Sequence, residues 1–162
     1  MGRLPGKGDM DRETAEHWMR EALEEARKAE SAGEVPVGAV VLVNNKIVGR
    51  GHNSSIRGHD PTAHAEIIAL RMAARSMKNY RMPGSIVIVT VEPCVMCAGA
   101  MIQARVEEVV YGAADPKAGA LDSHFHLAAA EQLNHQFVVT PHILKEECSS
   151  LLSAFFAVRR QP

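Results

Sequence analysis

The chain has 162 residues, enough for one domain with a sizeable core, and its 46% hydrophobic and 23% charged residues are ordinary for a globular protein. An odd count of three cysteines without a signal peptide argues against a disulfide framework and predicts a cytoplasmic, reducing location. No apolar run approaches the about 18 residues that a membrane helix needs, so no membrane partner is expected. A net charge of −1 neither requires nor excludes a nucleic-acid partner.

Hydrophobic periodicity and turn residues predict helices that alternate with strands. In chain order they are a helix over residues 11–31, strands over 37–43 and 46–51, a helix over 64–77, a strand over 85–91, a helix over 94–104, strands over 107–113 and 136–140, and a closing helix from 140. We expect residues 1–10, which are rich in glycine and charge, to be a disordered extension, and residues 11–162 to form a single domain.

Local signals define several of these boundaries. Asn44 and Asn45 form a tight turn between two strands, because asparagine tolerates a positive φ. Thr140 is a good N-cap for the closing helix, and Pro141 suits its first position. The order of elements predicts an α/β fold with a central mixed sheet of about five strands covered by helices, in which sites lie where strands lead into helix N-termini.

The stretch "VEPCVMC" places two cysteines at such a helix start. Cys94 and Cys97 are three residues apart and therefore lie on one face, one turn from each other. The unpaired amides and the positive dipole of a helix N-terminus stabilise thiolates. Two thiolates held in this way favour a metal ion or a redox partner.

The stretch "PTAHAEIIAL" adds a histidine and a glutamate at the start of a helix that is otherwise apolar. His64, Cys94 and Cys97 together would be three zinc ligands, which is the number in catalytic sites that keep a fourth position for water. Glu66 is poorly placed as a ligand on the same face, but it can serve as a base that moves protons. Two alternatives stay open: C-x-x-C as a redox motif, and a closed structural zinc site with Cys148 as fourth ligand. Cys148 also fits a core position by its helical spacing with leucines and Phe155.

The combination H-x-E followed by P-C-x-x-C is the signature of the zinc deaminases that act on nucleobases. The stretches "EVPVGAV", "GHN", "HDPTAHAEIIALR", "NYR", "TVEPCVMCAGAMI", "YGAADPKAG", "LNH" and "LLSAFFAVRRQ" extend the match in order over roughly residues 15–161. With them the chain resembles the bacterial tRNA-specific adenosine deaminases of the cytidine deaminase superfamily. That resemblance implies a three-layer α/β/α sandwich, one zinc ion per subunit, a homodimer, and the anticodon arm of a tRNA as partner.

The resemblance also implies the reaction, which is hydrolytic deamination of adenosine to inosine at wobble position 34, with tRNA-Arg as the expected substrate. His64, Cys94 and Cys97 would hold zinc, whose hydroxide attacks C6 of the base while Glu66 protonates the ring and then the leaving amine. Asn53 in "GHN" matches the base-binding asparagine of this family, although it also fits a turn residue that ends the strand pair.

RNA-facing residues are expected among basic and aromatic side chains. The candidates are Arg50, Arg57, Lys117, Phe155, Arg159 and Arg160. Two departures from the family affect the fit to an anticodon arm, namely the segment "ALDSHFHLAAAEQL" at 120–133 and Ala114, where arginine is frequent. The alternative function within the superfamily is deamination of a free base or nucleotide such as cytosine or guanine.

Overall fold

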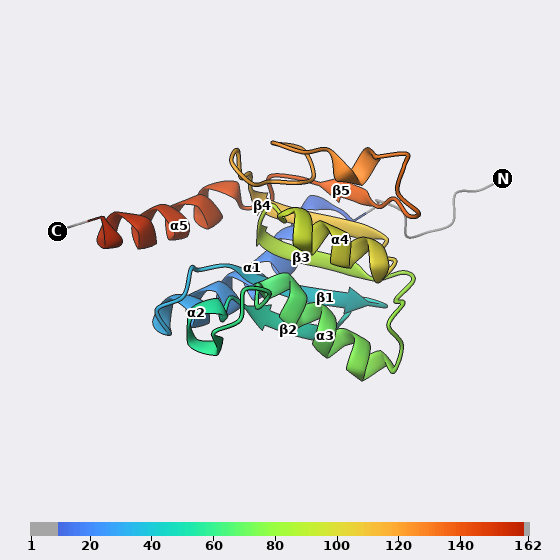
Figure 1. Ribbon diagram of the computed structural model, residues 1–162, viewed down its shortest axis with the longest axis horizontal. Coiled ribbons are helices and arrows are strands. Elements are labelled where there is room, and N and C mark those ends of the chain that lie inside the picture. The colour runs from blue at the N-terminus through green and yellow to red at the C-terminus, as the bar shows by residue number, and fades with distance from the viewer. Residues whose placement is uncertain (1–9, 161–162) are drawn as a thin grey trace.

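The computed structural model of the protein describes residues 10–160 (Figure 1). Its helices are α1 (Arg12–Ser31), α2 (Ser55–Gly58), α3 (Ala65–Met77), α4 (Val95–Gln103), the 3-10 helix η1 (Leu127–Ala129) and α5 (Lys145–Arg159). Its strands are β1 (Gly38–Val43), β2 (Lys46–His52), β3 (Ile86–Val91), β4 (Glu108–Ala113) and β5 (Val138–Thr140). Every helix and strand predicted from the sequence is present within two residues of its expected bounds, except for the start of α5.

The strands form one mixed sheet in the order β2-β1-β3-β4-β5, which confirms the prediction. β1 pairs antiparallel with β2 and β3, whereas β3, β4 and β5 run parallel. Asn44 and Asn45 join β1 to β2 with φ angles of 50° and 61°, as expected for this tight turn. The carboxyl ends of the parallel strands lie along one edge of the sheet, which is where open α/β folds place their sites.

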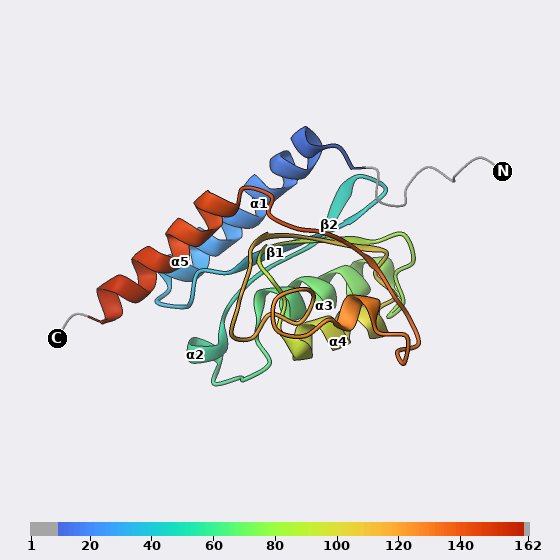
Figure 2. The ribbon, with the colours of Figure 1, turned by 90° about the horizontal axis from the view of Figure 1, so that it is seen from above.

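Helices cover both faces of the sheet and confirm the three-layer architecture. Figure 2 shows α1 and α5 on one face and α3 and α4 on the other. Two glycines of β2 let α3 approach closely, because a Cβ at Gly49 would lie 2.2 Å from Ala69 O and one at Gly51 would lie 2.4 Å from Ala65 O. The end of β2 is therefore in direct backbone contact with the start of α3.

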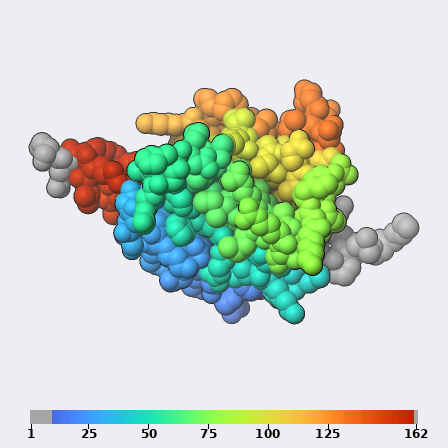
Figure 3. All heavy atoms as spheres, turned by 60° about the horizontal axis from the view of Figure 1, so that its bottom comes forward, coloured from blue at the N-terminus to red at the C-terminus, as the bar shows by residue number. Residues whose placement is uncertain are grey.

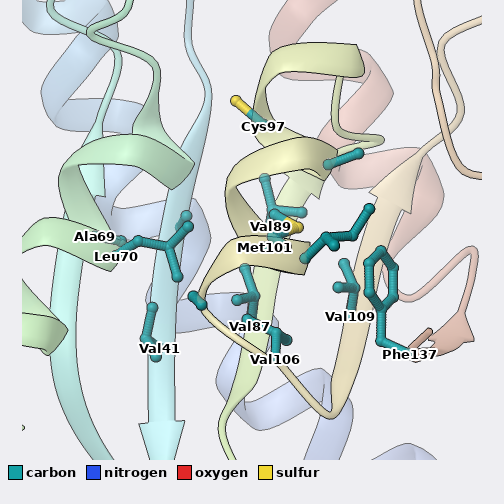
Figure 4. Close-up of a cluster of buried hydrophobic side chains, with 14 of the residues drawn as sticks. Val41, Ala69, Leu70, Val87, Val89, Cys97, Met101, Val106, Val109 and Phe137 are labelled. Atoms are coloured by element: carbon teal, nitrogen blue, oxygen red, sulfur yellow. The ribbon is translucent and has the colours of Figure 1, made fainter. Parts of the chain in front are cut away.

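Two hydrophobic clusters fill the layers on either side of the sheet. Figure 4 shows the cluster under α3 and α4, where Val41, Val87 and Met101 pack together. The second cluster lies under α1 and α5 and includes Met19 and Cys148. No helix within residues 10–160 has both the length and the apolar character needed to cross a membrane.

The prediction for the start of the closing helix is wrong. Thr140 is the last residue of β5, where it pairs with Val110, and its hydroxyl donates a hydrogen bond to the Glu108 carboxylate at 2.8 Å. α5 begins at Lys145, after Leu144 takes a left-handed φ of 50°. Strand pairing with β4 therefore prevails over the local Thr-Pro capping signal.

Two other expectations concern the loops and the chain ends. The polar loop between β2 and α3 contains the short helix α2, which the sequence pattern did not indicate. The predicted disordered extension falls on residues 1–9, which lie outside the described residues, and on Met10, which is half-buried against the α1-side cluster.

Candidate metal centre and substrate site

His64 and Cys94 occupy the same position, the N-cap, in α3 and α4, and neither side chain makes a capping hydrogen bond. Cys97 follows in the first turn of α4, and Figure 4 shows its sulfur pointing from α4 toward α3. Both helices belong to the layer below the sheet in Figure 2. Two neighbouring helix starts therefore bring together the three side chains that the sequence singled out.

The donor atoms have the separations that zinc requires. His64 Nδ1 lies 3.6 Å from Cys94 Sγ and 3.5 Å from Cys97 Sγ, and all three atoms lie within 4.8 Å of one another. A tetrahedral ion with bonds of about 2.05 Å to nitrogen and 2.3 Å to sulfur separates these atoms by about 3.6 Å. The residues present thus fit zinc, and within residues 10–160 no fourth side chain joins the group.

The local electrostatics favour one thiolate. A hydrogen bond from the Cys97 thiol, helped by His64, holds the pKa of Cys94 down to about 4. Glu66, in the first turn of α3, is 4% exposed, and burial raises the pKa of its carboxyl above the ordinary value. The groups that act on this carboxyl besides burial include its own backbone N–H, His64 and the two thiols. Glu66 is therefore a buried carboxyl at the edge of the donor group.

Cys148 is not part of this site. It is 1% exposed in the cluster under α1 and α5, on the opposite face of the sheet. Its sulfur packs on Gly112, where a Cβ would come within 2.4 Å of it, and burial raises the pKa of this thiol to about 12. The prediction of a core cysteine is confirmed, and a structural zinc site closed by Cys148 is contradicted.

Asn53 connects the end of β2 to the start of α3. Its Oδ1 accepts a hydrogen bond from the backbone N–H of Ala65 at 2.8 Å, and its own N–H donates to Val37 O at 3.2 Å. The side chain thus caps the helix that carries His64 and Glu66. Its Nδ2 amide is the group that can still donate to a bound base.

Three of the basic residues predicted to face RNA differ in their surroundings. Arg50 donates to Glu21 at 2.6 Å and to the buried Glu25 at 3.3 Å, so its guanidinium is already held by carboxylates of α1. Arg57 on α2 and Lys117 in the loop after β4 are exposed. The intramolecular ion pairs argue against a phosphate contact for Arg50 and leave Arg57 and Lys117 accessible.

The predicted residues of α5 also divide into anchored and accessible ones. Arg159 donates to Gly33 O at 2.6 Å, and its guanidinium lies 4.3 Å from the ring centroid of Phe155. This contact ties α5 to the loop after α1, whereas Arg160 is exposed beyond the end of the helix. Figure 3 shows α5 projecting from the body next to the face built by α2 and α3.

Sequence reasoning missed two buried carboxylates that hold the loops around the site. Glu34 is 2% exposed and accepts hydrogen bonds from the backbone N–H groups of Ile56 and Arg57 at the start of α2. Glu92 is 3% exposed and binds the loop after β4. Both stand in the stretches "EVPVGAV" and "TVEPCVMC", but nothing in their local pattern distinguishes an anchor from a solvated carboxylate.

The fold and the donor group define a class of protein, the zinc-dependent deaminases. The model of the cytidine and deoxycytidylate deaminase zinc-binding region matches residues 12–113. This range runs from α1 to β4 and includes the histidine, both cysteines of the donor group and Glu66. A guanine deaminase from Nitrosomonas europaea has the same fold, with a TM-score of 0.76 at 24% identity over 88% of this chain and 84% of that one.

Relatives with higher sequence identity show which family within the zinc-dependent deaminases this chain belongs to. A tRNA-specific adenosine deaminase of Haemophilus influenzae is 52% identical over 90% of this chain and 85% of its own length, and one of Bacillus subtilis is 44% identical over 90% and 91%. A solved structure from a study of A-to-I editing by tRNA:A34 deaminases has a TM-score of 0.82 and 39% identity, covering 84% of this chain and 99% of that one. The chain belongs to the family of tRNA-specific adenosine deaminases.

Proposed function

We propose that the protein deaminates adenosine to inosine at wobble position 34 of a tRNA anticodon, with tRNA-Arg as the expected substrate. The observation that carries the proposal is the three-donor group beside a buried carboxyl, in a chain 52% identical to a tRNA-specific adenosine deaminase. An anticodon loop suits a buried site, because its unpaired bases can be turned out of the stack at low cost.

In this proposal His64, Cys94 and Cys97 hold one zinc ion. Zinc in such a site supplies Lewis acidity that makes water a nucleophile near neutral pH. Glu66 lies in the first turn of α3, two residues after the metal-binding histidine, and its burial protects proton transfers from bulk water. It takes one proton from the attacking water and passes it to the ring nitrogen of the base, then takes the second proton from the hydroxyl now on C6 and passes it to the amine, which leaves as ammonia. Asn53 orients the base through its free Nδ2 donor.

The second candidate is deamination of a free base, since the guanine deaminase of similar fold carries that activity in its name. The test compares inosine formation in a tRNA-Arg anticodon stem-loop with ammonia release from free adenine, guanine and cytosine. We expect turnover of the stem-loop and none of the free bases, and a stem-loop with guanosine at position 34 serves as the control. Rapid turnover of a free base with an unchanged stem-loop would contradict the proposal.

The proposed assembly is a cytoplasmic homodimer, as the family resemblance implies. An apolar groove of about 400 Å³ between α3 and α4 supports it, and Leu70, Tyr80 and Ala100 are among the residues that line it. Tyr80 is 71% exposed, so an exposed aromatic side chain extends the apolar surface of the groove, and contiguous exposed apolar surface is typical of protein–protein contacts. Light scattering should give twice the chain mass. Ala100→Glu, which puts a charge into the groove, should shift the protein to monomer, whereas Val158→Glu on α5 should not.

A further inference from the structure

The buried Glu92 carboxylate accepts hydrogen bonds that hold the loop after β4 next to the site. Its Oε2 accepts hydrogen bonds from the backbone N–H groups of Leu121, Asp122 and Ser123 at 3.1, 2.8 and 3.0 Å. Its Oε1 accepts one from the N–H of Asp115 at 3.2 Å and a short one from the Ser123 hydroxyl. One side chain thus closes the whole loop from residue 115 to residue 123.

The same loop is attached to the segment that carries the metal donors. Ala120 N–H donates to Pro93 O at 2.8 Å, directly before Cys94. Gly119 packs so tightly that a Cβ there would lie 2.4 Å from Glu92 Cδ. The loop is therefore attached to the segment before Cys94 by one backbone hydrogen bond and by the buried Glu92 carboxylate.

The loop ends in an exposed aromatic tip. Gly119 O accepts hydrogen bonds from the N–H groups of both His124 and Phe125 at 3.0 Å, which makes a compact turn. Phe125 is 43% exposed, and the His124 ring meets it edge-on with 4.6 Å between centroids. Lys117, on the same loop, is exposed as well. An exposed aromatic face on the same loop as an exposed cation is a combination that suits single-stranded nucleic acid, because every base can stack on the aromatic ring.

We propose that residues 115–126 form a preorganised wall of the substrate site, in which Phe125 stacks on a nucleotide next to the target adenosine. Glu92 is the positioning residue that holds this wall against the metal-binding segment. The proposal rests on the tRNA function proposed above and adds the part of the RNA that the loop binds. It also assigns RNA binding to part of the segment at 120–133, which departs from the family pattern.

Substitutions at Phe125 test the stacking contact. Phe125→Leu keeps an apolar side chain but removes the aromatic face, and Phe125→Trp restores a larger one. We expect KM for the anticodon stem-loop to rise about 5- to 100-fold in Phe125→Leu and to stay near the wild-type value in Phe125→Trp. The kcat at saturating RNA and the zinc content should be unchanged in both. Equal KM values for wild type and Phe125→Leu would overturn the proposal.

Substitutions at Glu92 test the anchor. In Glu92→Gln the amide oxygen can keep the three N–H donors while its NH₂ donates to the Ser123 hydroxyl, so only the bond from Asp115 is lost. Glu92→Ala loses every one of them. We expect Glu92→Ala to raise KM at least tenfold with one zinc ion retained, and Glu92→Gln to rescue most of this loss.

Hydrogen exchange gives a readout that is independent of activity. The amides of Leu121, Asp122 and Ser123 should exchange faster in Glu92→Ala than in Glu92→Gln, whereas amides in the central strand β1 should be unaffected. Unchanged exchange, or loss of kcat with unchanged KM, would contradict the anchoring role. If Glu92→Ala does not fold, the Phe125 series decides the proposal alone. Failure of the wild type to form inosine would instead reject the proposed tRNA function.

Discussion

The two regions that flank the candidate metal donors each contain a buried glutamate, and they differ in the hydrogen-bond donors that surround the carboxylate. Glu66 follows His64 by two residues and Glu92 precedes Cys94 by two, and both are less than 5% exposed. The Glu92 carboxylate accepts four backbone N–H groups and one hydroxyl, and these donors lower its pKa although burial alone would raise it. Burial dominates at Glu66 and raises its pKa.

The difference shows how hydrogen-bond donors separate a structural carboxylate from a reactive one. A carboxylate that accepts several N–H groups is stabilised as an anion and has little tendency to take a proton. A buried carboxyl with few such donors can exchange a proton with a bound ligand, which is the property that a proton carrier needs. On this basis Glu92 supports the loop, and Glu66 is left for the chemistry.

The contrast between Glu66 and Glu92 requires a metal ion beside Glu66. A matched pair of cysteine variants tests this requirement, and the expected change in zinc content and activity is the largest of these predictions. Cys97→Ser should remove bound zinc and all deaminase activity, because an alcohol is a poor ligand compared with a thiolate. Cys148→Ser should keep one zinc ion and its activity, and should lose about 1–3 kcal/mol of stability because it buries a hydroxyl. Zinc content by mass spectrometry and thermal unfolding measure both. Zinc loss in Cys148→Ser would refute the assignment.

The same substitution at both glutamates separates their roles directly. Glu66→Gln should lower kcat about 10²- to 10⁴-fold, since the amide cannot carry protons, while zinc content and unfolding temperature stay near those of the wild type. Glu92→Gln should keep kcat at saturating RNA. Single-turnover inosine formation is the appropriate assay. Comparable kcat values for the two variants would show that the contrast between the carboxylates has no catalytic meaning.

Glu25, another buried carboxylate and not a member of the donor group, gives the smallest expected effect and serves as a reference for the pH dependence of stability. Glu25 accepts hydrogen bonds from Lys28 at 2.8 Å, His52 at 3.1 Å and Arg50 at 3.3 Å. These partners lower its pKa below the ordinary 4.5 against the opposing effect of burial. A lowered pKa in the folded state gives stability that is fully present above pH 4.5 and is lost as the pH falls through the folded-state pKa.

Glu25→Gln should therefore cost about 1–3 kcal/mol at pH 7 and flatten the decrease in stability on the acid side. Urea unfolding at pH 3.5, 5 and 7 measures both effects. Zinc content should not change, since Glu25 is not part of the donor group. A variant whose acid sensitivity equals that of the wild type would mean that the cluster contributes nothing to the pH dependence.

Most of the fold was predictable because its signals are local. Alternating apolar residues, the Asn44-Asn45 turn and Pro93 before a helix each specify structure within a few residues. The start of α5 was not predictable, because the capping preference of Thr140 competes with pairing to β4, which is distant in sequence. The ion pairs of Arg50, a predicted RNA contact, were likewise not predictable, since nothing near Arg50 in the sequence indicates that Glu21 and Glu25 lie beside it.

The sequence by itself predicted the three candidate metal donors and the glutamate proposed to carry protons, and it determined the order of strands and helices along the chain. Each of these depends on residue chemistry and on spacing along one segment. Only the tertiary structure decided the hydrogen-bond partners of Glu34 and Glu92, the isolation of Cys148 on the other face, and the contacts that hold the loop ending at Phe125. The physical reason is that a buried polar group acquires its function from the partners that satisfy it, and most of those partners come from other elements.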